Sequence, residues 1–578
     1  MGVRALLFDT RSIQRYVFSG NMLRTNIGAS YLVDRLFLDI LIKKTLKQDF
    51  FKEENTLDAK SWKGKEKINA KFENGCLCKV AYVGGGNALL LLNSEASADC
   101  EKSIVEGFTR RVLVQCPGLQ TGAAIGEMDF SSKESQKKSF DTMRAQLKNN
   151  QSRILPRVNV YNPGLTMECE INGESANYCD AKHIIKQDTE VRFYSQEVAA
   201  KVKAAADANK WLLAKLNDIF EKNGKPGLLD GFAFPTALEE LGQTEGEDYI
   251  AVVHVDGNNM GGRFSEKESL TQYKDFSNQV RRKTWKSFAR LVEHIVTTIR
   301  ETPKWFEGWL QLKKNREGKL LLPVRPLILG GDDITYVCAG KVALQYTERL
   351  MRYMMQPDPS AVQDKQKEKS GSGKKQKKVT DDSSIPCCGG IAIVNTSYPF
   401  FRAYMLAEQA CGAAKKVSRN SDGTSWLDFV ILHGEQETTL EQIRNQEYKG
   451  AQGNMHFGPY HVSDNDKIVE KDLRNLFTCI KKIHYNENRK FNMPTNKIKT
   501  MRDVLQHGSH ETRKFLEQLK ITFNIEGQSE MTAPKFPYKV EAWERYEENL
   551  WGEDKSHNWV TPYVDVIEMM DFYKPEDR

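Results

Sequence analysis

Two adjacent acids that follow a pair of glycines are the residues in this sequence best placed to do chemistry. An apolar run over residues 327–329 leads into Gly330, Gly331, Asp332 and Asp333, after which apolar and polar residues alternate. This pattern predicts a β-hairpin whose tight turn carries both carboxylates. Glycine lets a phosphate approach the backbone closely, and two carboxylates are hard oxygen ligands for Mg²⁺. An ordinary turn with solvated acids has the same composition, so the interpretation needs a second observation.

A third acid lies at the end of another predicted strand. Residues 249–255 are mostly apolar and predict a strand that ends on Asp256. The loop that follows is built from small and polar residues: Gly257, Asn258, Asn259 and Gly261. We expect the open backbone of this loop to bind a nucleotide. Asp256 and the two turn acids could together hold two Mg²⁺ or Mn²⁺ ions on a nucleoside triphosphate.

A lysine near the end of a predicted helix could supply a positive charge to the same site. Residues 399–416 begin with proline and place large apolar residues at helical spacing. Lys415 lies close to the end of this helix, from where it could reach a triphosphate. A lysine at a helix C-terminus is also a favourable partner of the helix dipole, so both interpretations of Lys415 stay open.

Composition sets wide limits on function. The chain has 578 residues, enough for three or four domains, and a net charge of +7 that is compatible with nucleotide or nucleic-acid partners. No apolar run approaches the ~18 residues of a membrane span, so we expect a cytoplasmic protein without a membrane partner. The eleven cysteines show no regular framework and are typical of reduced thiols. Cys169, Cys179 and His183 form a conceivable zinc set, but it lacks a CxxC pair.

The segment around the acids has a counterpart near the N-terminus. Asp9 ends a predicted strand over residues 3–9 and lies 75 positions before Gly84, while Asp256 lies 74 positions before Gly330. In both copies helical residues follow the acid, a hairpin turns on glycines, and a helix then leads to a strand of small residues. This is an internal repeat at domain scale. The order β-α-α-β-β-α-β predicts a ferredoxin-like palm with an extra helix, and we expect helices on one sheet face and ligands on the other.

The first turn of the repeat lacks the acids. It reads Gly84-Gly85-Gly86-Asn87, so we interpret the first copy as a nucleotide-binding or scaffold copy and the second as the catalytic one. The fold class is therefore α+β, with two ferredoxin-like palm domains. We predict four parts: a first palm over residues 1–130, a helical middle module and linker over 131–245, a second palm over 246–432 with a disordered basic insertion at 357–386, and a helical C-terminal domain over 433–578.

Several of these segments together resemble one known family. FDTRSIQRYVFSG followed by GAS, then VDGNNMG, GGDD, PFFRAYMLAEQACGAAKK, PTNKIKTMRDVL and TPYVDVIEMMDF occur in this order and span nearly the whole chain. They are similar to the large polymerase-like subunit of type III CRISPR effector complexes, the "Cas ten" family.

The resemblance implies an activity and a set of site residues. It implies paired palms that bind ATP and join it, with Mg²⁺, into cyclic oligoadenylate second messengers for antiviral defence. It also implies partners, namely other effector subunits with guide and target RNA. By motif, Asp256, Asp332 and Asp333 would be the metal ligands and catalytic acids. The turn glycines would shape the site, and Lys415 would contact phosphate.

Two departures from the family pattern leave alternatives open. Many members begin with an HD nuclease domain, whereas no His-Asp dipeptide occurs in this chain, so we expect no DNA cleavage from that source. Members often carry a second acid two residues after the first, where this chain has Asn258, an amide that could coordinate Mg²⁺ without adding charge. The alternatives are a weak or inactive nucleotide- or RNA-binding scaffold subunit and a stand-alone synthase of a cyclic dinucleotide.

Overall fold

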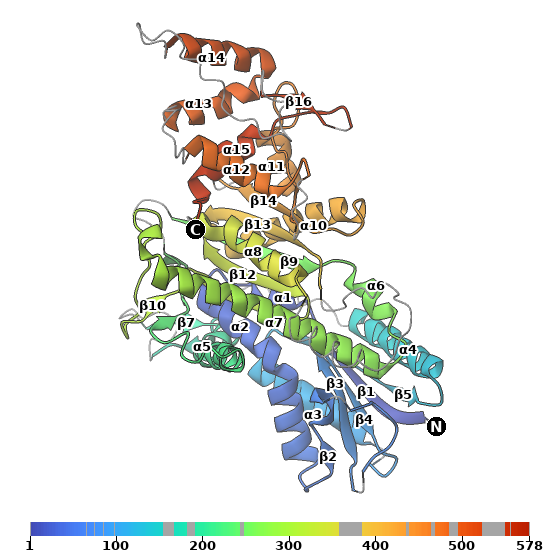
Figure 1. The fold of residues 1–578 in the computed structure, drawn as a ribbon. Coiled ribbons are helices and arrows are strands. Elements are labelled where there is room, and N and C mark those ends of the chain that lie inside the picture. The colour runs from blue at the N-terminus through green and yellow to red at the C-terminus, as the bar shows by residue number, and fades with distance from the viewer. Residues whose placement is uncertain are drawn as a thin grey trace.

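The computed structural model describes most of the chain. The described residues are 2–153, 167–181, 191–242, 248–357, 384–434, 439–463, 469–484, 495–522 and 550–576, apart from Lys65, Asn74, Gly85, Ala98 and Lys555. Two mainly antiparallel sheets with surrounding helices make up the body of the molecule, and a mainly helical region continues from the second sheet to the C-terminus (Figure 1). Most of the predicted basic insertion, residues 358–383, lies outside the described residues.

The first sheet contains the N-terminal strand near its centre. Its order is β2 (Leu57–Asp58), β3 (Cys78–Gly84), β4 (Asn87–Leu92), β1 (Gly2–Arg11) and β5 (Gln120–Asp129). Between β1 and β2 the chain forms α1 (Ile13–Val17), α2 (Leu23–Arg35) and a π-helix (Leu36–Phe50), and α3 (Cys100–Gln115) joins β4 to β5. The strand predicted over 3–9 and the predicted helix between the hairpin and the strand of small residues are therefore confirmed.

The second sheet repeats this arrangement around β9. Its order is β11 (Val324–Gly330), β12 (Asp333–Ala339), β9 (Tyr249–Gly257), β13 (Cys387–Asn395), β14 (Trp426–Ile431) and β15 (Tyr460–His461). The associated helices are α6 (Met260–Ser265), α7 (Leu270–Glu301), α8 (Ala343–Met355) and α10 (Phe400–Arg419). The hairpin predicted around the two acids and the helix predicted over 399–416 are confirmed. Strand β15 adds to the sheet from a segment that the sequence assigned to the C-terminal domain.

The two sheets share a topology and several local irregularities. In each, the second, third, first and fourth strands of the repeat lie side by side in that order, which is the ferredoxin-like arrangement. Each hairpin has a register shift shortly before its turn, between Val80 and Tyr82 and between Pro326 and Ile328. Three residues after the strand-end acid, Ser12 and Asn259 adopt left-handed conformations with φ of 54° and 52°. These matched details show that the internal repeat predicted from spacing is structural.

Both faces of each sheet are covered, so the expectation of one face left for ligands is wrong. In the first sheet, Leu6 and Phe8 pack in the core on one side, while the alternate residues Ala5 and Leu7 pack against Phe140 of α4 (Lys133–Ser152) and its neighbours. In the second sheet, Gly390 of β13 lies against α10 and Gly389 against α8. Successive residues of β1 and β13 are apolar or small, which suits a strand buried on both faces.

Long helices connect the two sheets. Helix α5 (Gln196–Lys222) packs along α2, and α7 extends from the first sheet towards the second (Figure 1). Both helices begin at a serine whose hydroxyl accepts a backbone N–H bond, Ser195 for α5 and Ser269 for α7. The small strands of this region are β6 (Tyr178–Cys179), β7 (Phe193–Tyr194), β8 (Phe232–Ala233) and β10 (Leu320–Leu321).

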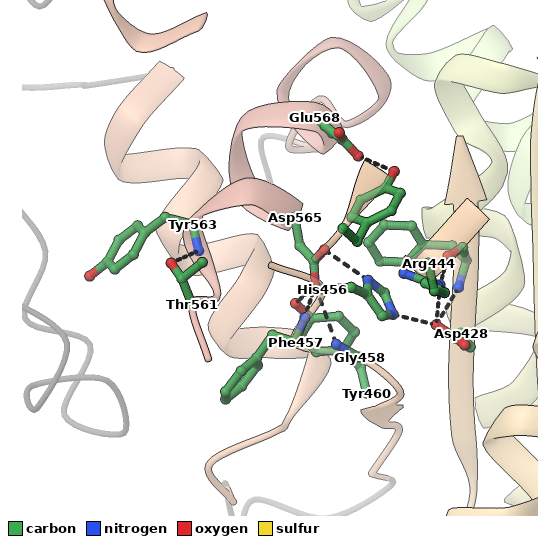
Figure 2. A network of polar contacts seen from close by, with 12 residues as sticks. Asp428, Arg444, His456, Phe457, Gly458, Tyr460, Thr561, Tyr563, Asp565 and Glu568 are labelled. Atoms are coloured by element: carbon green, nitrogen blue, oxygen red, sulfur yellow. Dashed lines mark hydrogen bonds and ion pairs between the residues drawn. The ribbon is translucent and has the colours of Figure 1, made fainter. Parts of the chain in front are cut away.

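A buried polar network joins the second sheet to the C-terminal region. This region contains α11 (Leu440–Glu447), α12 (Leu473–His484), α13 (Thr495–Gln506), α14 (Ser509–Thr522), β16 (Gly552–Glu553), β17 (Trp559–Val560) and α15 (Tyr563–Met569). His456 lies between two carboxylates, 2.8 Å from Asp428 of β14 through Nε2 and 2.9 Å from Asp565 of α15 through Nδ1 (Figure 2). Arg444 also donates to Asp428, and the Tyr460 hydroxyl donates to Asp565.

The network should make stability depend on pH in a defined direction. Burial and Arg444 lower the pKa of His456, but Asp565 and Asp428 outweigh them and leave the pKa raised above 6.5. Its contribution is therefore complete below pH 6.5 and is lost as pH rises through the folded-state pKa. We expect His456→Gln to lower the free energy of unfolding by about 3 kcal/mol or more at pH 6, and by less at pH 9. Urea unfolding at both values checks this.

The exposed His557 provides the matched control. Its contact with Glu553 lies at the surface, so His557→Gln should change stability little at either pH. A loss in His456→Gln that is equal at pH 6 and pH 9 would contradict the role given to the imidazolium.

Candidate functional site

The ends of β9 and β12 bring the three predicted acids together. The strands pair with Ile334 opposite Val255, so the next position places Asp333 opposite Asp256. The side chains of Asp332 and Asp256 share a hydrogen bond. A Cβ atom added to Gly257 would lie 2.9 Å from Cβ of Asp332, so the absence of a side chain there is what admits Asp332. The three acids therefore lie close together at the ends of these strands.

The crowding of the acids changes their protonation. Burial, followed by the charge of Asp256, raises the pKa of both Asp332 and Asp333 to about 7. A divalent cation among the three carboxylates would favour their ionised forms. Across the described ranges, however, no group of three or more His, Cys, Asp or Glu side chains is already arranged to hold a metal ion. The donor types fit Mg²⁺, but the arrangement has to adjust to receive it.

Lys415 accounts for part of this arrangement. Its ammonium forms an ion pair with Asp256. Burial lowers the pKa of Lys415, but Asp256 raises it more, and the net pKa is raised. The helix predicted over 399–416 thus places Lys415 next to the acids. There its ammonium is paired with the Asp256 carboxylate, which a metal ion would need as a ligand. A nucleotide phosphate would offer the ammonium an alternative partner.

Neutral donors from three elements surround Asp333. Nδ1 of His254 on β9 lies 3.4 Å from its Oδ1, and the hydroxyl of Thr335 on β12 lies 3.4 Å from the same atom. Burial lowers the pKa of His254, which favours the neutral imidazole. Gln14 of α1 also donates a hydrogen bond to Asp333. Neither His254 nor Gln14 was expected from the sequence. His254 lies two residues before Asp256 on the same face of β9, so its position in the sequence could have suggested that it lies near the acids. Nothing in the sequence around Gln14 suggested that it contacts Asp333.

The side-chain amide of Asn258 connects two loops beside the acids. Its side-chain nitrogen donates to the Ser418 hydroxyl at 3.0 Å, the Gly423 carbonyl at 3.0 Å and the Thr424 carbonyl at 3.1 Å. The amide therefore ties the loop after β9 to the loop after α10, the helix that carries Lys415. Asn258 is placed as a connection between these loops, and its amide nitrogen is fully engaged away from the three acids.

We expect Asn258→Asp to destabilise the protein and not to supply the second acid of the family pattern. A carboxylate cannot donate to the carbonyls of Gly423 and Thr424, so both lose a partner. The cost should be about 1–3 kcal/mol in the free energy of unfolding, measured by chemical denaturation. The matched control is Asn420→Asp, an exposed residue at the end of the same helix. Equal stability of the two variants, or tighter Mg²⁺ binding by Asn258→Asp, would contradict this expectation.

The remaining predicted nucleotide-binding residues lie on two turns. Gly331 has a φ of 66°, and its carbonyl accepts a hydrogen bond from Thr284 of α7. Gly330 has ordinary space for a side chain. Asn259 adopts the left-handed conformation at the start of α6, and a Cβ at Gly261 would meet no atom within 4 Å, so this loop is open.

In the first copy, Gly84 lies beside Ser277 of α7, because a Cβ there would be 2.8 Å from the Ser277 hydroxyl. Gly85 lies outside the described residues.

A cavity of about 600 Å³ connects the two turns. Its lining includes Gly84, Gly86 and Asn87 of the first turn and residues 330–333 of the second, with residues from α2 and α7 between them. Ser277 at the first turn and Thr284 at the second are seven residues apart on α7, a rise of about 10 Å. The volume is within the range of small-molecule sites. The site is thus a cavity between the two palms with acids at one turn only.

The suggested zinc set gains no support. Cys169 is buried in a small apolar cluster with Tyr194 and Val198, Cys179 is exposed on β6, and His183 lies outside the described residues. In the parts of the chain with described positions, none of the helices is long and apolar enough to cross a membrane.

Comparisons with known proteins agree with the fold. Residues 249–422 match the family model described as Cas10/Cmr2, second palm domain. A crystal structure of a Csm1–Csm4 cassette in complex with cA4 aligns over 99% of this chain and 70% of its own, with 10% identity and a TM-score of 0.51. A cassette with cA3 has 11% identity, the same 99% coverage of this chain, 69% of its own, and a TM-score of 0.48. Csm1 from T. onnurineus has 10% identity, 99% and 70% coverage, and a TM-score of 0.45.

At this level of identity the first of these structures shows a shared fold, and the other two add no argument. No curated protein matched the chain. The family match covers β9, the acidic turn and Lys415, which are the parts that form the site. Residues 249–422 therefore match the Cas10/Cmr2 second palm domain, from the family that the motifs of this chain resemble.

Proposed function

We propose that the protein is a divalent-metal-dependent nucleotidyltransferase that joins ATP into cyclic oligoadenylates as the large subunit of a type III CRISPR effector complex in the cytoplasm. The observation that carries the proposal is the convergence of Asp256, Asp332 and Asp333 beside a cavity shared by both palms. The Csm1–Csm4 cassette with the same fold holds cA4, which supports this product class and a partner subunit. Guide and target RNA are the partners that such a complex would add.

Each group of residues at the site has a separate role in this reaction. Mg²⁺ or Mn²⁺ held by the three acids would lower the pKa of the attacking ribose hydroxyl and neutralise triphosphate charge. The ribose oxygen forms a bond to the α-phosphorus of the second ATP, and pyrophosphate leaves. Lys415 transfers its contact from Asp256 to the phosphates. Gln14, His254 and Thr335 hold Asp333 in orientation, and most of the rate comes from positioning and charge neutralisation.

The test uses the full chain, alone and with its guide complex and target RNA. Labelled ATP is incubated with Mg²⁺ or Mn²⁺, and products are separated by chromatography and identified by mass. Cyclic oligoadenylates that depend on the metal support the proposal. No product above background in any of these mixtures would overturn it.

A binding subunit without turnover is the second candidate. The ion pair between Lys415 and Asp256, and the lack of a ready-made metal arrangement among the described residues, favour it. It predicts saturable ATP binding with no pyrophosphate release. Pyrophosphate release under the same conditions excludes it, and ATP binding without release supports it.

A further inference from the structure

Arg325 is a buried cation without an anion. It lies on β11, it is 2% exposed, and it lines the cavity between the palms. One nitrogen donates to the Asn209 side chain of α5, and Nε has no partner. Among the described residues no carboxylate lies within 4 Å of its guanidinium, which has five N–H donors. Most of the N–H donors of Arg325 therefore have no acceptor among the described residues.

The surroundings of Arg325 leave its charge uncompensated. Burial alone lowers the pKa of Arg325 to about 9, without an opposing contribution from a nearby acid. Phe234 lies 5.8 Å from the guanidinium and gives only a weak cation–π contact. A buried charge that lacks a partner is costly to the folded state. A ligand that supplies the missing anion would remove this cost.

Arg325 is remote from the acids but shares their cavity. It precedes Gly330 by five residues on β11, about 16 Å along the strand. A second guanidinium, Arg281 of α7, also lines the cavity. Burial lowers the pKa of Arg281, and the nearby carboxylate of Asp34, which also lines the cavity, raises it. The effect of burial is larger, so the pKa of Arg281 is lowered overall. The cavity thus has the acidic turn at one end, and the rest of its wall carries two guanidinium groups and the carboxylate of Asp34, which lies near Arg281.

The chemistry of the proposed reaction assigns a ligand to this end. Two nucleotides react, and metal ions held by Asp256, Asp332 and Asp333 would neutralise the triphosphate of the donor. In the acceptor, the 5′-triphosphate lies on the other side of the ribose from the reacting hydroxyl, so it points away from the acids. It needs a separate cationic group, and planar guanidinium groups match phosphate oxygens.

We propose that Arg325, assisted by Arg281, forms a phosphate subsite for the 5′-triphosphate of the acceptor nucleotide. This inference rests on the proposed function for the identity of the nucleotide, but the subsite itself is defined by the unpaired arginine and the cavity.

The subsite is tested by binding of inorganic tripolyphosphate to the full chain in EDTA, which removes the metal contribution. We expect Arg325→Met to bind about 10- to 100-fold more weakly than the wild type, while its melting temperature without ligand is equal or higher, since an unpaired buried charge has been removed. Arg282→Met is the matched control, because Arg282 neighbours Arg281 on α7 without lining the cavity. It should bind like the wild type.

The proposal would be overturned if the wild type did not bind tripolyphosphate or if Arg325→Met bound it as tightly as the wild type. It would also be overturned if the melting temperature of Arg325→Met fell, because Arg325 would then have a purely structural role. If Arg325→Met fails to fold, Arg325→Lys takes its place, with at least about threefold weaker binding expected from the loss of the planar fork; unchanged affinity would again overturn it.

Acceptor use separates the two proposals. With ATP as donor, the wild type should form pppApA from acceptor ATP faster than ApA from acceptor adenosine, and Arg325→Met should form both at similar rates; an unchanged preference in the variant counts against the subsite. A wild type that binds tripolyphosphate but forms no product would refute the proposed function and leave the anion subsite standing.

Discussion

Replacing Asp332 and Asp333 together by asparagine is expected to reduce product formation from ATP by about a thousandfold or more. The substitution keeps the size and shape of both side chains but removes the charges that would hold the metal ions. Metal-ion stabilisation of the transition state is worth several kcal/mol, and each ~1.36 kcal/mol is a factor of ten in rate. The measurement is the initial rate of product formation at saturating Mg²⁺. The first turn already has Asn87 at the position of Asp333, so the fold accepts asparagine there.

The same variant should be more stable than the wild type when metal is absent. The folded-state pKa of both acids is about 7, above the ordinary value of 3.8. The folded protein therefore binds more protons than the unfolded chain between these values, and the wild type loses stability as pH rises through this window. In EDTA, the melting temperature of the variant should exceed that of the wild type at pH 8, and the difference should shrink at pH 5.

A control removes two charges elsewhere. Asp141→Asn with Asp275→Asn changes two exposed helical acids and should leave rate and pH dependence unchanged. Full activity of the Asp332 and Asp333 double variant would place the chemistry at another site.

Gly257→Ala is expected to lower the rate about a hundredfold without unfolding the protein. An alanine Cβ would lie 2.9 Å from Cβ of Asp332 and 2.9 Å from Cγ of Met260, closer than such atoms approach. Met260 can rotate, but Asp332 sits on a two-residue turn whose strands are fixed by pairing, so the acid has to move. Misplacement of a reacting group by about 1 Å can reduce the rate about a hundredfold. The readouts are the rate and the midpoint of Mg²⁺ activation, which should rise.

Gly434→Ala is the control for Gly257→Ala. A Cβ at Gly434 meets no atom within 4 Å, and the residue is exposed, so activity and stability should stay at the wild-type level. A normal rate in Gly257→Ala would mean that Asp332 tolerates displacement and does not ligate the metal.

The repeat, the strands and the main helices could be predicted from the sequence because apolar spacing and glycine turns are local signals. Asp256, Asp332 and Asp333 could be grouped because the second copy has nearly the same spacing as the first and because acids at strand ends beside glycines favour a metal site. The coverage of both sheet faces was not foreseen, although Ala5 and Leu7 alternate with Leu6 and Phe8 in one continuous apolar run. Such a run indicates burial on two faces, whereas a strand with one wet face would alternate apolar and polar residues.

The residues around the acids were harder to foresee. Gln14 reaches Asp333 from the other copy of the repeat, and this contact depends on how the two palms pack. The donor bonds of Asn258 depend on the path of the loop at 423–424. Arg325 lies within a strand that is otherwise apolar, and its lack of an anion is visible only when burial and neighbours are known. Each of these features belongs to tertiary structure, for which spacing within one segment carries no information.

The matched register shifts and left-handed residues show that the two copies are built alike, and both turns face the cavity that the copies share. In the present chain one member has Gly86 and Asn87 where the other has Asp332 and Asp333, so the two turns differ in the residues that could hold a metal ion. Under the proposed function, only one of two facing nucleotides could then act as donor. A polymer made in such a cavity would grow in one direction, and ring closure would require its far end to travel back to the single centre.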